Sequence, residues 1–124
     1  MNVPVVIGGY HPSILPEEAK QHADSVVIGE AEKTWSCLLQ DFEEDKLKDF
    51  YFSEDFVDPK LIPSAYHGAL PGYQPCRSVQ ATRGCPYRCE FCIGEKVEGS
   101  RLHKRSIENV IEEIKSIKSS FLFF

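Results

Sequence analysis

The chain of 124 residues carries a formal net charge of −5 and is 42% hydrophobic and 27% charged, which is ordinary for a soluble globular protein. The acidic balance argues against a nucleic-acid-binding protein, because no basic stripe is available to neutralise phosphates. The sequence contains neither an apolar run of membrane-spanning length nor a signal-peptide pattern, so we expect a cytoplasmic protein without membrane partners. Five cysteines, three of them clustered, favour a metal site in a reducing compartment over a disulfide framework.

The first half of the chain predicts alternating strands and helices. Residues 3–7 form a buried strand, "GGYHPS" a turn, and Pro16 opens a short helix. Residues 25–29 form a second buried strand. A second helix covers about 32–42, with an apolar stripe at helical spacing made of Trp35, Leu38, Leu39 and Phe42. This β-α-β-α order is typical of a parallel sheet with crossover helices.

The middle of the chain changes character between residues 43 and 75. It is rich in acids and aromatics, and four of the eight prolines lie between Pro59 and Pro75. No hydrophobic period persists, so we expect a linker, assigned to 48–75, that packs against another surface through its aromatic side chains.

The second half predicts a β-loop-α-β unit. A strand at 78–82 leads into the cysteine-rich stretch, and Ser106 caps a helix at about 107–118. The stripe of that helix is Ile107, Val110, Ile111, Ile114 and Ile117. "FLFF" then begins another strand. With buried-type strands at both ends, we expect the chain to be a fragment of a longer protein.

The clustered cysteines, Cys85, Cys89 and Cys92, have the spacing C-x3-C-x2-C. An odd number of thiols cannot all pair as disulfides, and a structural zinc site needs a fourth ligand, for which Cys76, His67 or His103 are candidates. Three thiolates at short spacing favour a [4Fe–4S] cluster with one iron left open. A non-catalytic zinc or interaction module and a Cys89–Cys92 redox relay remain alternatives.

The stretch "RGCPYRCEFC" resembles the signature of radical S-adenosylmethionine enzymes. The resemblance implies that the three cysteines bind the cluster, that S-adenosylmethionine chelates the open iron, and that Phe91 lies against its adenine. Residues 76–124 would then begin a partial (β/α)6 barrel. The parent enzyme would form a 5′-deoxyadenosyl radical for methylation, cyclisation or rearrangement of a small-molecule substrate, as in magnesium-protoporphyrin monomethyl ester oxidative cyclases. A one-electron donor such as ferredoxin or flavodoxin is implied, and we expect the fragment alone to be inactive.

Residues 1–47 look like the closing βαβα of a flavodoxin-like, cobalamin-binding domain. Such a sheet binds its ligand at the carboxyl ends of its strands. The candidate cofactor-binding residues there are Gly8, Gly9, His11, Gly29 and Glu30. The D-x-H-x-x-G pattern of many cobalamin domains is absent, so His11 is not expected to bind cobalt.

Other side chains invite less specific expectations. Trp35 and Cys37 are expected to be buried in the hydrophobic core on which their helix packs. Arg105 is the best candidate in its cationic cluster for a contact with an anion, although a solvated face is the simpler interpretation. Arg83, Arg88 and Lys96 could offset the charge of a thiolate-ligated cluster.

Overall fold

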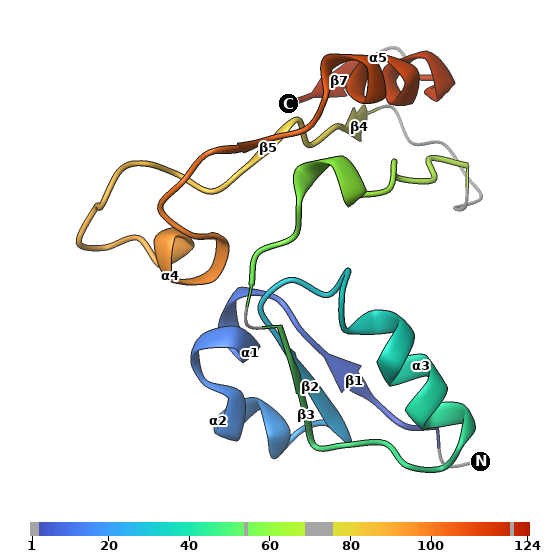
Figure 1. Ribbon diagram of the computed structural model, residues 1–124, viewed down its shortest axis with the longest axis vertical. Coiled ribbons are helices and arrows are strands. Elements are labelled where there is room, and N and C mark those ends of the chain that lie inside the picture. The colour runs from blue at the N-terminus through green and yellow to red at the C-terminus, as the bar shows by residue number, and fades with distance from the viewer. Residues whose placement is uncertain (1–2, 54, 69–75, 120) are drawn as a thin grey trace. The chain divides into compact units, whose positions relative to one another are not determined.

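The protein is an α/β chain that divides into two compact units. The computed structural model describes residues 3–53, 55–68, 76–119 and 121–124 (Figure 1). Unit 1 comprises residues 1–57 and 84–101, and unit 2 comprises residues 58–83 and 102–124. The cysteine-rich segment therefore clusters with the first half of the chain, whereas the sequence domains placed it with the second half. No helix among the described residues is long and apolar enough to cross a membrane.

Unit 1 is built on a parallel sheet in the order β1-β2-β3. Its strands are β1 (Val6–Ile7), β2 (Ser25–Ile28) and β3 (Phe50–Phe52). Val6 pairs with Ser25, and Val26 pairs with Phe50. The expected parallel arrangement of the first two strands is confirmed, and the carboxyl ends of all three strands lie at one edge of the sheet.

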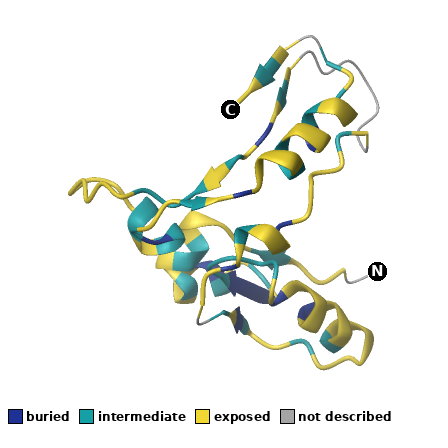
Figure 2. Ribbon diagram, turned by 45° about the horizontal axis from the view of Figure 1, so that its top comes forward, coloured by how far each residue is buried: buried dark blue, intermediate teal, exposed yellow. Residues whose placement is uncertain are grey.

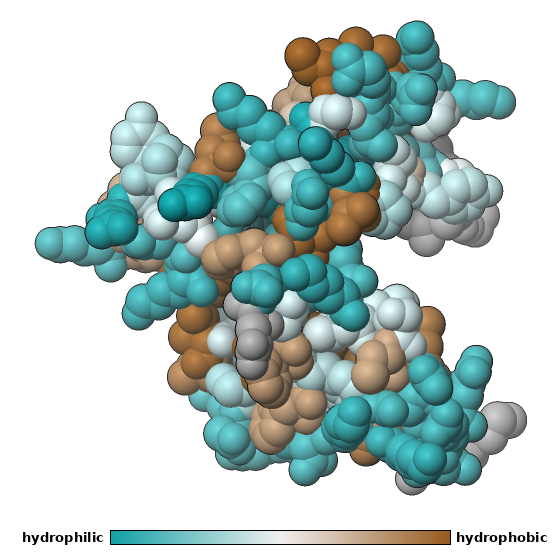
Figure 3. Space-filling view, in the orientation of Figure 1, coloured by the Kyte–Doolittle hydropathy of each residue, from teal (hydrophilic) through white to brown (hydrophobic). Residues whose placement is uncertain are grey.

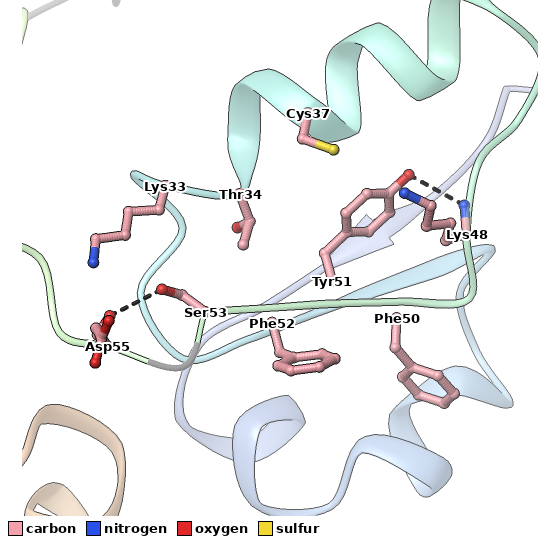
Figure 4. A pocket seen from close by; sticks show the side chains of 9 residues that line it. All are labelled: Lys33, Thr34, Cys37, Lys48, Phe50, Tyr51, Phe52, Ser53 and Asp55. Carbon is pink, nitrogen blue, oxygen red and sulfur yellow. Dashed lines mark hydrogen bonds between the residues drawn. The ribbon is translucent and has the colours of Figure 1, made fainter.

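Strand β3 lies in the segment that the sequence analysis assigned to a linker. Three residues among acids and prolines carry no readable period, and the strand exists because β2 supplies a hydrogen-bonding partner. Tyr51 points to one face of the sheet, while Phe50 and Phe52 point to the other, as the two-residue strand period requires (Figure 4).

Helices cover both faces of this sheet. α1 (Tyr10–Ile14) and α2 (Pro16–Lys20) lie on one face, and α3 (Trp35–Glu43) lies on the other (Figures 1 and 4). The start of α2 at its proline is confirmed. The expectation of a simple turn at "GGYHPS" is wrong, because α1 begins there: Gly9, at φ +101°, forms its N-cap, and Ser13 Oγ donates to the Gly9 carbonyl at 2.7 Å.

The core of unit 1 forms around Val27, Leu38 and Tyr51, where α3 packs on the sheet (Figure 2). Of the apolar stripe predicted for α3, only Leu38 is buried; Trp35 remains 48% exposed. The core assignments of Trp35 and of Cys37, which is also exposed, are therefore wrong for this unit. A three-stranded sheet is too narrow to cover the whole stripe. Hydrophobic residues accordingly appear at the surface among polar ones in Figure 3.

Unit 2 contains the strands and the helix of the predicted β-loop-α-β unit, while the cysteine loop itself belongs to unit 1. Strands β4 (Cys76–Ser78) and β7 (Phe121–Phe123) pair in parallel, and α5 (Ile107–Ser116) lies between them in the chain. The strand expected at 78–82 is displaced: after β4 the chain forms β5 (Thr82–Arg83), which pairs antiparallel with β6 (His103–Lys104). A 3-10 turn, η1 (Pro59–Leu61), completes the unit. The cap at Ser106 is confirmed, since its hydroxyl accepts the Asn109 N–H at 3.2 Å.

The most buried residue of helix α5 is a charged one, while its apolar stripe is half-buried or exposed. Glu113 is 2% exposed, whereas Ile107 is 72% and Ile111 is 44% exposed. Arg105, which the sequence suggested for an anion or a solvated face, is buried beside Glu113 at 8% exposure. Both charges can be buried because each neutralises the other.

Candidate functional site

The two ends of the cysteine loop, residues 84–101, lie side by side. The antiparallel pair β5–β6 matches Arg83 with His103, and the Cys85 N–H donates to the Gly99 carbonyl at 3.3 Å. Within the loop a short helix, α4 (Gly94–Glu98), follows the last cysteine. α4 was not predicted from the sequence, because five residues are too few for an apolar period to be recognised.

Gly84 permits the loop to close. Its φ is +79°, and a Cβ built at this position would lie 2.1 Å from the carbonyl oxygen of Arg101. Only a residue without a side chain fits such a backbone approach. This glycine therefore allows a tight turn directly before the first cysteine.

The three candidate metal ligands are free thiols. Cys85 is half-buried, and Cys89 and Cys92 are exposed. A turn joins the last two, with the Cys92 N–H donating to the Cys89 carbonyl at 3.0 Å, and the Gly94 N–H donates to Cys92 Sγ at 3.4 Å. Across the described ranges, no group of three or more His, Cys, Asp or Glu side chains is gathered as a metal site. The donor set nevertheless suits iron, since soft thiolates bearing N–H hydrogen bonds are the ligands of iron–sulfur clusters.

Three other residues that the sequence suggested for a cofactor or metal site are Phe91, Arg88 and His67. Phe91 is 89% exposed, so its ring is free to contact a ligand beside the loop. Arg88 Nε lies 3.1 Å from Glu95 Oε1. This glutamate balances the positive charge of Arg88, which was expected to offset the negative charge of a cluster. His67, a candidate fourth zinc ligand, instead places Nε2 2.9 Å from Glu113 Oε1 in unit 2.

A cavity of about 220 Å³ lies at the carboxyl ends of β2 and β3 in unit 1. It contains two of the predicted cofactor-binding residues, Gly29 and Glu30. The Gly29 N–H donates to Ser13 Oγ at 2.9 Å, and Glu30 Oε2 accepts the Val57 N–H at 2.5 Å. Among the described residues, the lining comprises Ser13, Ile28, Gly29, Glu30, Ser53, Asp55, Phe56, Lys96 and Val97.

The other three predicted cofactor-binding residues do not line this cavity. A Cβ at Gly8 would lie 3.4 Å from Val27, so this glycine permits close packing on β2. Gly9 caps α1, and His11 Nε2 lies 3.2 Å from Glu18 Oε1 on the exposed surface. The sequence rule locates the strand ends correctly, but it cannot tell which strand-end residues turn toward a cavity and which serve the neighbouring helix.

Glu98 joins the cysteine loop to α1. Tyr10 Oη donates to Glu98 Oε1 at 2.5 Å, and the Gly84 N–H donates to Glu98 Oε2 at 3.2 Å. The hydrogen bond to Glu98, assisted by partial burial and by the nearby negative charge, raises the pKa of Tyr10 to about 12. No sequence signal identifies this pair, because its members are 88 positions apart.

A second cavity of unit 1, of about 520 Å³, lies between α3 and the outer edge of β3 (Figure 4). None of the site residues predicted from sequence lines it. Its wall includes Tyr51, whose hydroxyl donates to Asp41 at 2.8 Å, and Lys48, whose Nζ lies 2.9 Å from the same carboxylate. These contacts from Lys48 and Tyr51 lower the pKa of Asp41. Lys48 and Tyr51 of this cavity are thus both engaged with Asp41, which lies outside its lining.

No protein-family model matches the chain, and no solved structure matches it.

The chain is similar to curated methyltransferases. It is 34% identical over 125 positions to the bacteriochlorophyllide d C-8(2)-methyltransferase of Chlorobaculum tepidum, covering 94% of this chain and 28% of that protein. The C-12(1)-methyltransferase of the same organism is 33% identical over 118 positions, covering 90% and 26%. The hopanoid C-2 methylase of Rhodopseudomonas palustris is 29% identical over 118 positions, covering 91% and 22%. The chain thus spans about a quarter of the length of these relatives.

Proposed function

We propose that this chain is part of a radical S-adenosylmethionine methyltransferase that adds a methyl group to a carbon atom of a small molecule. The observation that carries the proposal is the C-x3-C-x2-C loop within a chain that aligns over 94% of its length with a carbon-directed methyltransferase. Several relatives carry names that specify a carbon position, so methylation is favoured over the cyclisation or rearrangement that the cysteine signature alone also allows.

In this proposal Cys85, Cys89 and Cys92 hold a [4Fe–4S] cluster. The cluster would supply one electron for cleavage of S-adenosylmethionine to methionine and a hydrogen-abstracting 5′-deoxyadenosyl radical, and a second S-adenosylmethionine would supply the methyl group. A donor such as ferredoxin or flavodoxin provides that electron. The Gly94 N–H directed at Cys92 Sγ stabilises negative charge on the sulfur. Phe91, exposed beside the thiols, is suited to stack on the adenine of the cofactor.

We further propose that the sheet of unit 1 belongs to a flavodoxin-like domain that receives cobalamin at its strand ends. The support is the parallel order of the strands and the cavity beside Gly29 and Glu30. At about 220 Å³ this cavity is smaller than the roughly 300–1,000 Å³ of sites that enclose a drug-sized ligand. It would therefore contact one part of a larger cofactor. Unit 2 would begin the radical barrel with its parallel β4–α5–β7 unit.

Anaerobic reconstitution of the intact protein with iron and sulfide tests the proposal. We expect a brown protein with about four irons per chain. It should release 5′-deoxyadenosine when given S-adenosylmethionine and a reductant. Replacing Cys85, Cys89 or Cys92 singly by alanine should abolish both properties. Matched variants at the two remaining cysteines, Cys37→Ala and Cys76→Ala, should retain the iron, since neither belongs to the loop.

Two results would contradict the proposal. A colourless protein with one zinc ion per chain would indicate the non-catalytic zinc module. An intact, reduced, iron-loaded protein that releases no 5′-deoxyadenosine would contradict the assignment as a radical S-adenosylmethionine enzyme. Methylation is tested separately: methyl-labelled S-adenosylmethionine should transfer its label to a small molecule.

A further inference from the structure

Glu98 uses both carboxylate oxygens to hold the base of the cysteine loop. Oε2 accepts the N–H of Gly84, the residue immediately before the first cysteine, at 3.2 Å. Oε1 accepts the hydroxyl of Tyr10 at 2.5 Å. Tyr10 is the first residue of α1, which follows β1 in the sheet. One side chain therefore connects the strand-end region of unit 1 with the point where the loop begins.

The backbone around Glu98 restricts the same point. The residue after it, Gly99, accepts the Cys85 N–H through its carbonyl at 3.3 Å. A Cβ at Gly99 would lie 2.8 Å from the ring of Phe56, also in unit 1, so the loop base packs closely on this aromatic side chain. Cys85 is the only half-buried thiol of the three, while the other two are exposed. The first thiol is thus held by its backbone, and the other two lie on the open part of the loop.

We propose that Glu98 is a positioning residue that fixes the backbone of Cys85 relative to α1, so that the loop presents its first ligand in a set place before any cluster binds. The iron-binding part of this inference rests on the proposed function, but the backbone restraint does not. A carboxylate suits the role because an ionised group accepts two strong hydrogen bonds at once, one from an amide and one from a phenol. An amide side chain has only one oxygen to accept with and would lose one of the two.

Hydrogen exchange in the metal-free protein tests the restraint directly. We expect Glu98→Gln and Tyr10→Phe each to speed exchange of the amides of Gly84 and Cys85 about tenfold, because each variant removes a hydrogen bond to a charged acceptor. The double variant should exchange no faster than the faster single variant, since both changes break one chain of contacts. Glu95→Gln is the matched control: it lies on the same helix, is paired with Arg88 at the loop surface, and should leave these amides within twofold of the original protein.

A second measurement separates positioning from general stability. After reconstitution, Glu98→Gln should shift the electron paramagnetic resonance signal of the reduced cluster and raise its midpoint potential, because a negative charge near the thiolates is lost. Glu98→Asp should partly restore the slow exchange, whereas Glu98→Ala should not. The thermal midpoint of each variant shows whether the fold as a whole is retained.

The outcomes distinguish this inference from the proposed function. If Glu98→Gln exchanges like Glu95→Gln at Gly84 and Cys85, the positioning role is wrong, whether or not iron binds. If both exchange predictions hold but the original protein takes up no iron, the proposed function fails while the restraint stands. If exchange changes but the spectrum and potential of the cluster do not, the assignment of Glu98 as a positioning residue for the ligand is wrong.

Discussion

Arg105 and Glu113 form a buried ion pair in unit 2, with Nη2 of the arginine 2.6 Å from Oε2 of the glutamate. The second carboxylate oxygen faces His67 Nε2 at 2.9 Å. Arg105 also donates to the Gln80 carbonyl at 2.9 Å and to Ser64 Oγ at 3.3 Å. The pair therefore ties Ser64, before β4, and Gln80, between β4 and β5, to α5.

Removing the charge of Glu113 should destabilise unit 2 strongly. Glu113→Gln leaves the Arg105 guanidinium buried without its counter-ion, and breaking a buried pair in this way costs about 3–5 kcal/mol. Urea unfolding followed by circular dichroism measures the change. Glu112→Gln, at the exposed neighbouring position of α5, should change the free energy of unfolding by less than about 0.5 kcal/mol. Equal effects of the two variants would show that the buried pair does not stabilise the unit.

Acid should weaken the same region. Burial alone would raise the pKa of Glu113, but the hydrogen bond from His67 and the contact with Arg105 outweigh it, so the pKa lies below its usual 4.5. The folded state thus holds this proton less tightly than the unfolded state does. The stabilisation is present above pH 4.5 and is lost as the pH falls through the lowered pKa. The urea midpoint of the original protein should fall more steeply from pH 6 to pH 3 than that of Glu113→Gln. Parallel curves would exclude a contribution from this carboxyl group.

Alkali should weaken the contact between α1 and the cysteine loop. Since the pKa of Tyr10 is raised from 10.0 to about 12, the folded state keeps the phenol proton where the unfolded state loses it. Stability from this group is therefore complete below pH 10 and declines as the pH rises toward 12. The difference in phenolate absorbance between the original protein and Tyr10→Phe gives the titration of this group. In Glu98→Gln the same difference should titrate at a lower pH, and an unchanged titration would contradict the assigned cause.

Gly84→Ala should disrupt the loop base. The added methyl group would meet the Arg101 carbonyl, and the positive φ of this residue disfavours any side chain, which together cost about 1–3 kcal/mol. We expect a lower melting temperature of the metal-free protein and a reduced capacity to bind iron. Gly94→Ala is the control within the same loop, because its Cβ would meet only Cys92 Sγ at 3.4 Å and its φ is ordinary. If both alanine variants melt alike, closure at Gly84 does not limit stability.

Local sequence signals predicted the elements that depend on local chemistry. Pro16 marked the start of α2, Ser106 marked the cap of α5, and the hydrophobic runs marked β1 and β2. Each of these signals acts over a few residues, so it can be recognised without knowledge of the fold. The spacing of the three cysteines is a local signal of the same kind, and the ligand role that it indicates stays a prediction.

Features that depend on distant partners could not be predicted in this way. β3 forms only beside β2, and the Tyr10–Glu98 contact joins residues from opposite ends of unit 1. Glu113 lies at the flank of an apolar stripe, where a charged residue normally faces solvent. Its burial depends on Arg105 and on His67, which is 46 positions away in a segment without periodicity. The sequence therefore predicted the parallel pairing of the first two strands better than it predicted which charges are buried.

The antiparallel stem at Arg83 and His103 has a consequence for how this chain can vary. The stem pairs through its backbone and the Glu98 side chain holds the loop base, so the exposed tip of the loop, which carries the residues between the thiols, lies away from these closing contacts. Exposed tips of this kind tolerate substitution and insertion more readily than the elements that carry them. The residues between the thiols, apart from Phe91, can thus vary in sequence more readily than Gly84 and Glu98, which hold the loop base.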